Sequence, residues 1–536
     1  MHACLNVDEI LRLIVSELVG LEAKAAAAAL ACCCKSFEDP VLDTLWETQN
    51  RLLPLLNSLP VDVWNEGGCT VSAPAAPVFY RLNYLVLKSF KRPPTALEWD
   101  RFREYTRRMR GLEEYGDLIV LPPEVYSALQ LCSTANEPLF PQLETLGLSC
   151  VTPEFVPFIP LFLSPKTTAI SIKLVTHDFP EPTIVASVIT TFPTLCPNLR
   201  NISLRPLSRG PMIASAVSRM LLASNQNVLR CFDVDSPLTK EAREVICKLP
   251  DLHNLSVVIG EDTSIPLVVL PNLTNLTVEY AYDSGWLGAF HGATLGKLKA
   301  VTFRSGSEQN GDLLEAFEKV VLAASSQNTL SEFNLHIPRL RNPKYCSLLT
   351  FTQLTNLVIE FSCDDGCSSS VDDDVIMNLA RTMPKLKDIF LGSAPCEIPT
   401  GVTAKGLVAL AHHCSDLTTL RIHFQVASLT APPDIGGTIP NVESTALRRD
   451  CGLKRLMVGK IPVPEESVLI VALTLARIFP HIEYIDHVDE NWEKVMCAIC
   501  LSRRITDYSG KEQPSPHLEV TLVTLPQESQ LRIVGW

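Results

Sequence analysis

Most of the chain repeats a short apolar pattern, Leu-x-x-Leu-x-Leu, in which the spacing residues are often polar or small. The pattern predicts a short strand at each copy. Apolar residues are common enough in this chain to produce about a dozen matches by chance, so the pattern alone is weak evidence. The copies begin on average about 28 residues apart, at Leu143, Leu199, Leu229, Leu252, Leu273, Leu298, Leu330, Leu354, Leu386, Leu417 and Leu453, and more weakly at Thr167 and Ile482.

Prolines placed before the copies strengthen the case for a repeat. The motif is an apolar residue or cysteine followed by a proline, with the proline two positions before the first apolar residue of the copy. The chain has 39 prolines in 536 residues, so about one copy should carry this motif by chance. Proline ends a helix, and a short strand then follows. We therefore predict an α/β fold in which helix–strand units stack into a curved solenoid with parallel strands over residues 136–490. The pair is present before six copies, as Phe140-Pro141, Cys196-Pro197, Leu249-Pro250, Leu270-Pro271, Met383-Pro384 and Phe479-Pro480.

The same repeat predicts which side chains line the concave face. Residues 312–325, 374–382, 404–413 and 468–479 supply helices between copies. Side chains alternate along a strand, so the position before the last apolar residue and the one after it face away from the core. The mixed charge of these positions favours a protein or peptide target over a nucleic acid. We predict that the target contacts Arg205, Asp233, Asp235, Glu279, Arg304, His336, Glu360, Arg421, His423 and Met457.

The first fifty residues predict three short helices. Residues 5–18 place Ile10, Leu11, Ile14, Val15 and Leu18 on one apolar stripe. Residues 22–34 are rich in alanine, the strongest helix former. In residues 35–49 we expect Asp39 to cap a third helix that starts at Pro40. Its side chains Val41, Leu42, Leu45 and Trp46 would lie on one side. Three short helices bury little apolar area alone, so we expect them to need a partner surface.

This N-terminal pattern resembles the F-box of basidiomycete fungal F-box proteins. The residues that carry the resemblance are Leu5, Ile10, Leu11, Ile14 and Leu18, then Cys34-Lys35-Ser36-Phe37 and Pro40 to Trp46. Residues 52–64 are similar to the segment that follows the F-box in that group, whereas the usual Leu-Pro opening is replaced by Leu5-Asn6-Val7. A period near 28 with a helix in each unit resembles ribonuclease-inhibitor-type leucine-rich repeats. The order of the two parts matches that fungal family, with residues 60–135 the least clear.

The resemblance implies a substrate-recognition subunit of a Skp–cullin–F-box type ubiquitin ligase, which is not itself an enzyme. Residues 1–59 would form the F-box, 60–135 a connector with a basic helix, 136–490 the repeats and 491–536 a C-terminal cap. A leucine-rich-repeat scaffold without a ligase link stays open as the alternative. The resemblance implies that a Skp-type adaptor, and through it a cullin, is bound by Leu5, Ile10, Leu11, Ile14, Leu18, Leu42, Leu45 and Trp46.

Charge bears on the remaining partners. The net charge is −13, which disfavours a protein-wide nucleic-acid or membrane surface. Residues 81–110 nevertheless hold nine basic and three acidic residues, and 98–110 read as a basic helix. That helix could bind a nucleic acid. We favour the alternative, in which it is a solvated linker whose basic side chains pair with the acidic array. Residues 492–501 predict a last helix, 509–517 a loop and 518–525 a closing strand.

Catalytic and cofactor motifs are missing. The sequence has no P-loop, dinucleotide glycine fingerprint, His-Glu-x-x-His or Gly-x-Ser-x-Gly. Cys497-x-x-Cys500, His412-His413-Cys414 and the aspartate-rich stretch 363–374 lack the spacing of metal sites, and Asp372 to Asp374 suit a helix start. We expect no cofactor and no metal. The 18 cysteines follow no disulfide plan and no secretory signal or membrane span is visible, so we expect a cytoplasmic or nuclear protein.

Overall fold

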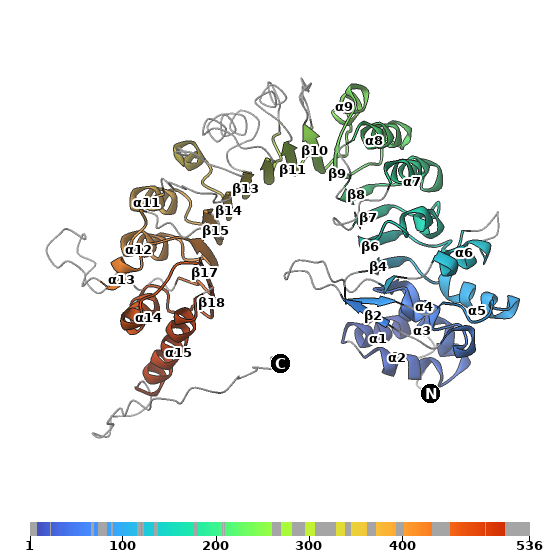
Figure 1. Cartoon of the computed structure of the whole chain (residues 1–536), viewed down its shortest axis with the longest axis horizontal. Helices are drawn as coiled ribbons and strands as arrows, with labels where there is room; N and C mark the ends of the chain where they lie inside the picture. Colours follow the sequence, from blue (N-terminus) through green and yellow to red (C-terminus); the bar gives the residue numbers. More distant parts are fainter. Residues whose placement is uncertain are drawn as a thin grey trace.

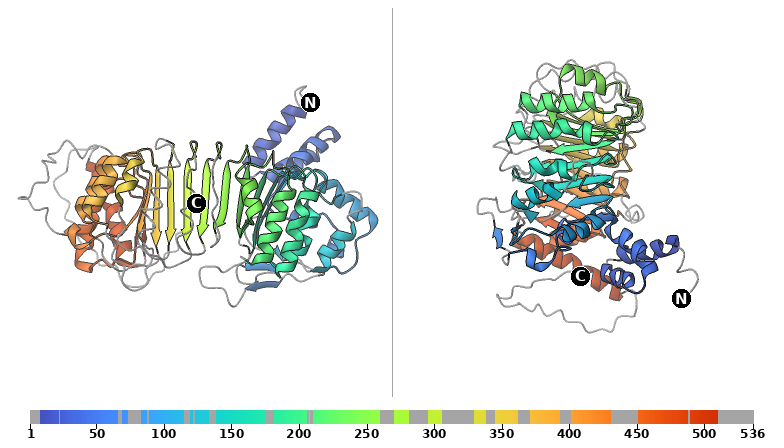
Figure 2. Two further views of the ribbon diagram at one scale, coloured as in Figure 1. Left: turned by 90° about the horizontal axis from the view of Figure 1, so that it is seen from above. Right: turned by 90° about the vertical axis from the view of Figure 1, so that its right-hand side faces the viewer.

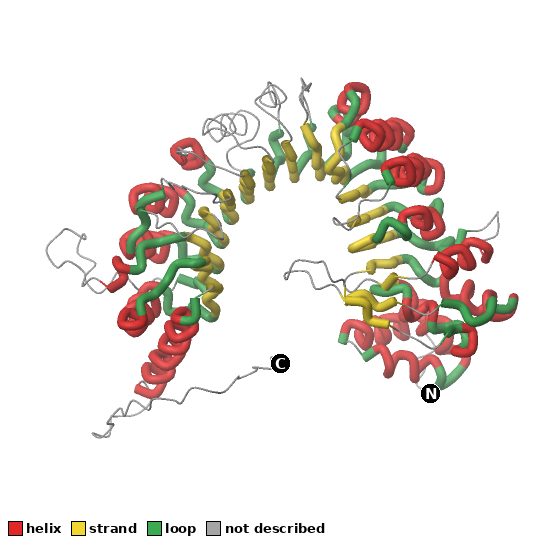
Figure 3. Tube along the Cα trace, in the orientation of Figure 1, coloured by secondary structure: helices red, strands yellow, loops and turns green. Residues whose placement is uncertain are grey.

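The chain forms a curved arc with strands on the inner side and helices on the outer side (Figure 1, Figure 3). The computed structural model describes residues 8–21, 23–65, 69–72, 83–86, 89–114, 119–120, 123–132, 138–174, 181–205, 207, 210–259, 270–280, 295–305, 329–337, 345–361, 371–392, 401–430, 451–487 and 489–509. Seen from above, the strands run side by side along the arc, and the N-terminal helices project at one end (Figure 2).

One sheet of 15 parallel strands runs through the described part of the arc. Its order follows the sequence, so each strand pairs with the next along the chain. The α/β prediction with parallel strands is confirmed, and all 13 predicted copies form strands, β6 to β18. The strands are β1 (Thr48–Gln49), β4 (Gly111–Glu114), β6 (Thr145–Val151), β7 (Ala169–Leu174), β8 (Asn201–Arg205), β9 (Cys231–Pro237), β10 (Asn254–Ile259), β11 (Asn275–Tyr280), β12 (Ala300–Ser305), β13 (Glu332–Ile337), β14 (Asn356–Phe361), β15 (Asp388–Gly392), β16 (Thr419–Ile422), β17 (Arg455–Gly459) and β18 (Tyr484–His487).

The repeated apolar positions hold the sheet to its helices. Strand pairing aligns the middle leucine of each copy with that of the next, as in Leu255↔Leu276 and Leu276↔Val301. These side chains are at most 2% exposed. Removing one buried leucine side chain costs about 2–5 kcal/mol, so each copy contributes to a continuous core.

Helices cover the convex side of the sheet. The predicted helices at 374–382, 404–413 and 468–479 are present, whereas 312–325 lies outside the described residues. Asp372 caps α11, where its carboxylate accepts a hydrogen bond from the Val375 amide at 2.9 Å. The helices of this layer are η3 (Val156–Phe162), α7 (Pro182–Leu195), α8 (Pro211–Ala223), α9 (Lys240–Ile246), η5 (Tyr345–Thr350), α11 (Asp373–Thr382), α12 (Ala404–His413), α13 (Ala427–Thr430), η6 (Glu465–Ser467), α14 (Val468–Ile478) and α15 (Asn491–Ser509).

Three helices form a small unit at the N-terminal end: α1 (Asp8–Gly20), α2 (Lys24–Ala31) and α3 (Lys35–Glu47). They share a core of their own, formed by Leu11, Val15, Ala27, Phe37 and Val41. The predicted start of the third helix at Pro40 is wrong: α3 begins at Lys35, and Pro40 lies inside it. The added turn contains Phe37, which is 4% exposed and packs in the unit's core.

The segment after this unit is more regular than predicted. It contains α4 (Leu53–Leu56), η2 (Val61–Val63), α5 (Ala96–Thr106), α6 (Pro123–Cys132) and a three-stranded sheet of β2 (Cys69–Ser72), β3 (Asn83–Val86) and β5 (Ile119–Val120). The basic helix α5 ends at Thr106, before the predicted Arg110. Met109 and Leu112 are fully buried, so the chain leaves the helix and enters the main sheet as β4. The sheet thus begins well before residue 136.

The C-terminal helix and the cysteines complete the described structure. Helix α15 is longer than predicted, and residues 510–536, with most of the predicted loop and the whole closing strand, lie outside the described residues. None of the described helices combines the length and apolar character needed to cross a membrane. Burial raises the pKa of Cys414 to about 12 and that of Cys196 to about 11, so these thiols stay protonated and pack as apolar groups.

Glu114 occupies a core position of the sheet. Strand pairing aligns it with Leu148, the last leucine of its copy. Burial raises the pKa of Glu114 to about 7 against the attraction of Arg51, and its Oε1 atom is shielded from solvent without a hydrogen-bond partner among the described residues. The folded protein therefore favours the protonated carboxyl, and the stability that this form provides is lost as pH rises through about 7.

We expect Glu114→Leu to raise the free energy of unfolding by about 1–3 kcal/mol at pH 8.5, because it replaces a buried carboxylate by an apolar group. The gain should shrink at pH 5.5, where the folded protein keeps Glu114 protonated. Denaturant unfolding at both pH values measures the difference. Glu113→Leu, which removes a charge from the neighbouring residue, is the control. An equal gain at both pH values would contradict the assignment.

Candidate interaction surfaces

Helix α1 leaves an apolar stripe uncovered. Its inner face buries Leu11 and Val15 in the core of the N-terminal unit. On its outer face Ile10 is 38% exposed, Leu13 67% and Ile14 39%, and Leu21, just past the end of the helix, is 76% exposed. Residues spaced by three and four positions lie on one side of a helix, so Ile10, Leu13 and Ile14 form one apolar strip, here called the α1 stripe. The exposed Glu17 separates this strip from Leu21. An exposed apolar strip on a helical unit that already has its own core is a candidate binding surface.

The α1 stripe revises the predicted adaptor contacts. Ile10 and Ile14 are on it, together with Leu13, which was not among the predicted contacts. Leu11 is only 1% exposed, so its prediction as a contact is corrected: it packs inside the unit. Three further predicted contacts, Leu18, Leu42 and Leu45, are half-buried. Leu5 lies outside the described residues.

Trp46 joins the N-terminal unit to the array and is not a free anchor. Its ring stacks on Tyr105 of α5, with 4.5 Å between ring centroids, and it packs against the main core. The backbone makes a second connection, because β1 pairs with β4 and the Arg110 amide donates to the Glu47 carbonyl at 2.8 Å. Trp46 is therefore removed from the adaptor contacts and assigned to docking.

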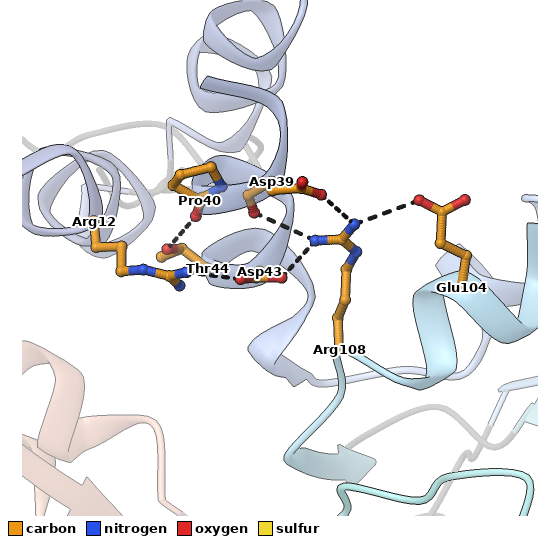
Figure 4. A network of polar contacts seen from close by, with 7 residues as sticks. All are labelled: Arg12, Asp39, Pro40, Asp43, Thr44, Glu104 and Arg108. Atoms are coloured by element: carbon orange, nitrogen blue, oxygen red, sulfur yellow. Dashed lines mark hydrogen bonds and ion pairs between the residues drawn. The ribbon is translucent and has the colours of Figure 1, made fainter. Parts of the chain in front are cut away.

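One arginine ties the unit to the array (Figure 4). Arg108, which follows α5 and is 14% exposed, donates to the carboxylates of Asp39, at 2.7 Å, and Asp43. The other oxygen of Asp43 accepts from Arg12 of α1 at 2.8 Å. Burial alone would raise the pKa of Asp43, but hydrogen bonds from Arg12 and Arg108 lower it below its usual value. Two helices, α1 and α3, and the segment after α5 thus meet at one carboxylate.

We expect Arg108→Ala to loosen the N-terminal unit, because it leaves Asp39 and Asp43 facing each other without the guanidinium between them. The loss should be about 1–3 kcal/mol and appear as faster amide hydrogen exchange in α1, α3 and β1. Arg101→Ala removes the same charge from an exposed position of α5 and serves as control. Equal exchange in both variants would show that stacking and strand pairing suffice.

Two further arginines of residues 81–110 also have acidic partners. Arg92 binds Asp62 and Glu98, and Arg110 lies 3.7 Å from Glu144. Hydrogen bonds from Arg92 lower the pKa of Glu98 to about 2. The prediction that basic residues here pair with the acidic array is confirmed for Arg110, whose partner Glu144 lies in the array, whereas Arg92 pairs with acids of the connector itself. The region gives a nucleic-acid interface little support.

The first half of the concave face carries a closed network of charges. Arg205 of β8 donates to Asp233 of β9, to Ser256 of β10 and, at 2.9 Å, to Glu279 of β11. Asp233 also accepts from Ser203, and Arg304 of β12 lies 3.4 Å from Glu279. Four predicted target contacts, Arg205, Asp233, Glu279 and Arg304, are therefore brought together. Arg304 is the most open, with 49% of its side chain exposed, whereas Glu279 is 9% exposed.

A second, more open cluster lies on β13 to β16. Glu360 is 40% exposed and joins His336, at 3.0 Å, to Arg421, at 3.3 Å. The guanidinium of Arg421 lies 6.0 Å from the centre of the Phe390 ring, a cation–π distance. Phe390 was not among the predicted contacts, although it occupies the same position in its copy as Arg421 does in the next.

Three predicted contacts are not available to a target. Glu279, held in the charge network of β8 to β12, is 7% exposed as a whole residue. Asp235 is 8% exposed, and its carboxylate accepts from the Leu207 amide at 2.8 Å, so it holds a loop after β8. A register shift in β9 explains its altered position. His423 is 3% exposed. Met457 is half-buried and stays a candidate.

The part of the chain that the structure describes contains no group of three or more His, Cys, Asp or Glu side chains that could hold a metal ion. His412 and His413 contact each other by their rings at the end of α12. No protein-family model matches the chain, and neither does any curated protein sequence.

Proposed function

We propose that this protein recruits substrates to a Skp–cullin–F-box type ubiquitin ligase. The α1 stripe would bind the Skp-type adaptor, and through it the cullin, while the concave face of a leucine-rich-repeat array would bind a target protein. The observation that carries the proposal is the α1 stripe itself, which stays exposed on a helical unit that already has its own core. The F-box resemblance of the same residues supplies the class of partner.

The arrangement suits a role in proximity. A helix that inserts apolar side chains into a partner's groove gives a compact, specific contact. The unit that presents this helix is fixed to the array by β1, Trp46 and Arg108. A target on the concave face would thus be held at a defined distance from the adaptor, which raises its effective concentration near the ubiquitin-charged enzyme.

A second function is supported by one feature. Strand β1, which directly follows the N-terminal unit, is the first strand of the main sheet, so the unit stands at the end of the array. A repeat scaffold without a ligase link would use the unit in that way alone, because solenoids need a capped end.

Complex formation with a purified fungal Skp-type adaptor separates the two functions. The full chain and the adaptor are mixed and resolved by size-exclusion chromatography. A stoichiometric complex supports the ligase subunit. Failure to form a complex at micromolar concentrations of both proteins would leave the scaffold as the better proposal.

A further inference from the structure

The concave face changes in character along one row of aligned residues. Strand pairing places one residue per strand in this row, at the position before the last apolar residue of each copy. On β7 to β13 the row is polar, with Ser171, Ser203, Asp233, Ser256, Thr277, Thr302 and Asn334. On β14 to β17 it continues as Val358, Phe390, Arg421 and Met457, all half-buried. Aromatic side chains, Met and Arg are enriched where proteins bind one another.

Phe390 lies at the centre of this second part. Val358 and Arg421 flank it on the neighbouring strands. Gly392, two residues further along β15, has φ of 116°, and no heavy atom of the described residues lies within 4 Å of where a Cβ would stand. The absence of a side chain there leaves room beside the ring for an apolar group of a partner.

The two arginines near Phe390 are each matched by a carboxylate, and further carboxylates lie beside them. Arg455 of β17, in the same row as Asp388, contacts Asp486 at 3.2 Å. The charge of Glu360 is balanced by Arg421. Asp388, on the same strand as Phe390, accepts from the neutral donors Asn356, at 3.0 Å, and Thr418, at 3.3 Å. Glu332 on β13 adds another exposed carboxylate. This balance favours a basic partner.

The first half of the concave face offers no equivalent. Its central guanidinium, Arg205, already donates to Asp233, Ser256 and Glu279, and the aligned row there is polar. Displacing these bonds would leave half-buried charges unpaired, which is costly.

We propose that Phe390 and its neighbours on β14 to β17 bind a peptide segment of the target that carries a large apolar side chain next to lysine or arginine. The proposal rests on the target-binding role of the concave face. The apolar side chain would pack on Phe390 beside Gly392, and the basic one would face Asp388 and Glu332.

Three pools of fluorescent twelve-residue peptides test this inference with the full chain. One pool has a central large apolar residue with basic flanks, the second has the same centre with acidic flanks, and the third has basic flanks around alanine. We expect fluorescence anisotropy to show the first pool bound at least about tenfold more tightly than the others. Phe390→Ala should remove the advantage over the alanine pool, and Asp388→Asn should reduce the advantage over the acidic pool about threefold or more.

Thr302→Ala, at the same row position on β12, is the matched control and should bind like the wild type. Asp388→Asn keeps the proposal testable if Phe390→Ala fails to fold. Tighter binding of the acidic pool, no binding of any pool, or binding unaffected by both variants would overturn the inference. Adaptor binding through the α1 stripe is measured separately. A failure of peptide binding would leave the ligase proposal standing, and a failure of adaptor binding would leave the peptide-binding proposal standing.

Discussion

Leu13→Asp is expected to abolish binding of a Skp-type adaptor while leaving the fold intact. Leu13 is 67% exposed in the middle of the α1 stripe and makes no contribution to the core of the N-terminal unit. A carboxylate there would be buried without a partner in the adaptor's apolar groove. Losing a central apolar contact costs about 2–4 kcal/mol of binding free energy. This corresponds to a dissociation constant about 30- to 1,000-fold higher. Isothermal titration calorimetry of the purified pair measures it.

Leu97→Asp provides the matched control for this prediction. Leu97 is 81% exposed on α5, so the substitution makes the same chemical change at an equally open apolar position. It should leave both the affinity and the melting temperature unchanged. Equal adaptor binding by Leu13→Asp and the wild type would remove the α1 stripe from the contact and favour the scaffold function.

The repeats could be predicted because their information is local. Three apolar positions per copy set the strand, and a preceding proline sets the end of the helix. The 13 copies therefore matched 13 strands. Strands β1 and β4 were missed for a physical reason. In β4 the series reads Met109, Leu112 and Glu114, so a carboxylate stands where the pattern needs an apolar residue, and β1 has only two residues.

The candidate surfaces were harder to predict because they depend on contacts between distant segments. Helix α1 is apolar on two sides, and its sequence does not show which side the unit uses for its own core. Leu11 was therefore confused with Leu13. The sequence alone suggests that Trp46 is an exposed anchor, because its stacking partner Tyr105 comes from a helix that is distant in the sequence. The bond between Arg205 and Glu279 joins residues 74 positions apart, which strand alternation alone cannot pair.

Arg205→Ala is expected to cause the largest loss of stability among the concave-face substitutions. The guanidinium lies between Asp233 and Glu279, and the Glu279 side chain is only 9% exposed. Removing it leaves two carboxylates close together in a poorly solvated position, which typically costs about 3–5 kcal/mol. Repeats contact only their neighbours, so the loss should concentrate on β8 to β12 and spare α14. Hydrogen exchange with mass spectrometry resolves the two regions.

Two further variants test the physical cause. Arg304→Ala removes a cation that is 49% exposed and lies 3.4 Å from the same Glu279, so we expect a cost below about 1 kcal/mol. Adding Glu279→Gln to Arg205→Ala should recover about 1–2 kcal/mol, because it removes one of the two uncompensated charges. A similar cost for Arg205→Ala and Arg304→Ala, or no recovery in the double variant, would mean that packing and not charge holds this half of the concave face. In that case the polar row would be free to bind a target, and the preference for β14 to β17 would lose its electrostatic basis.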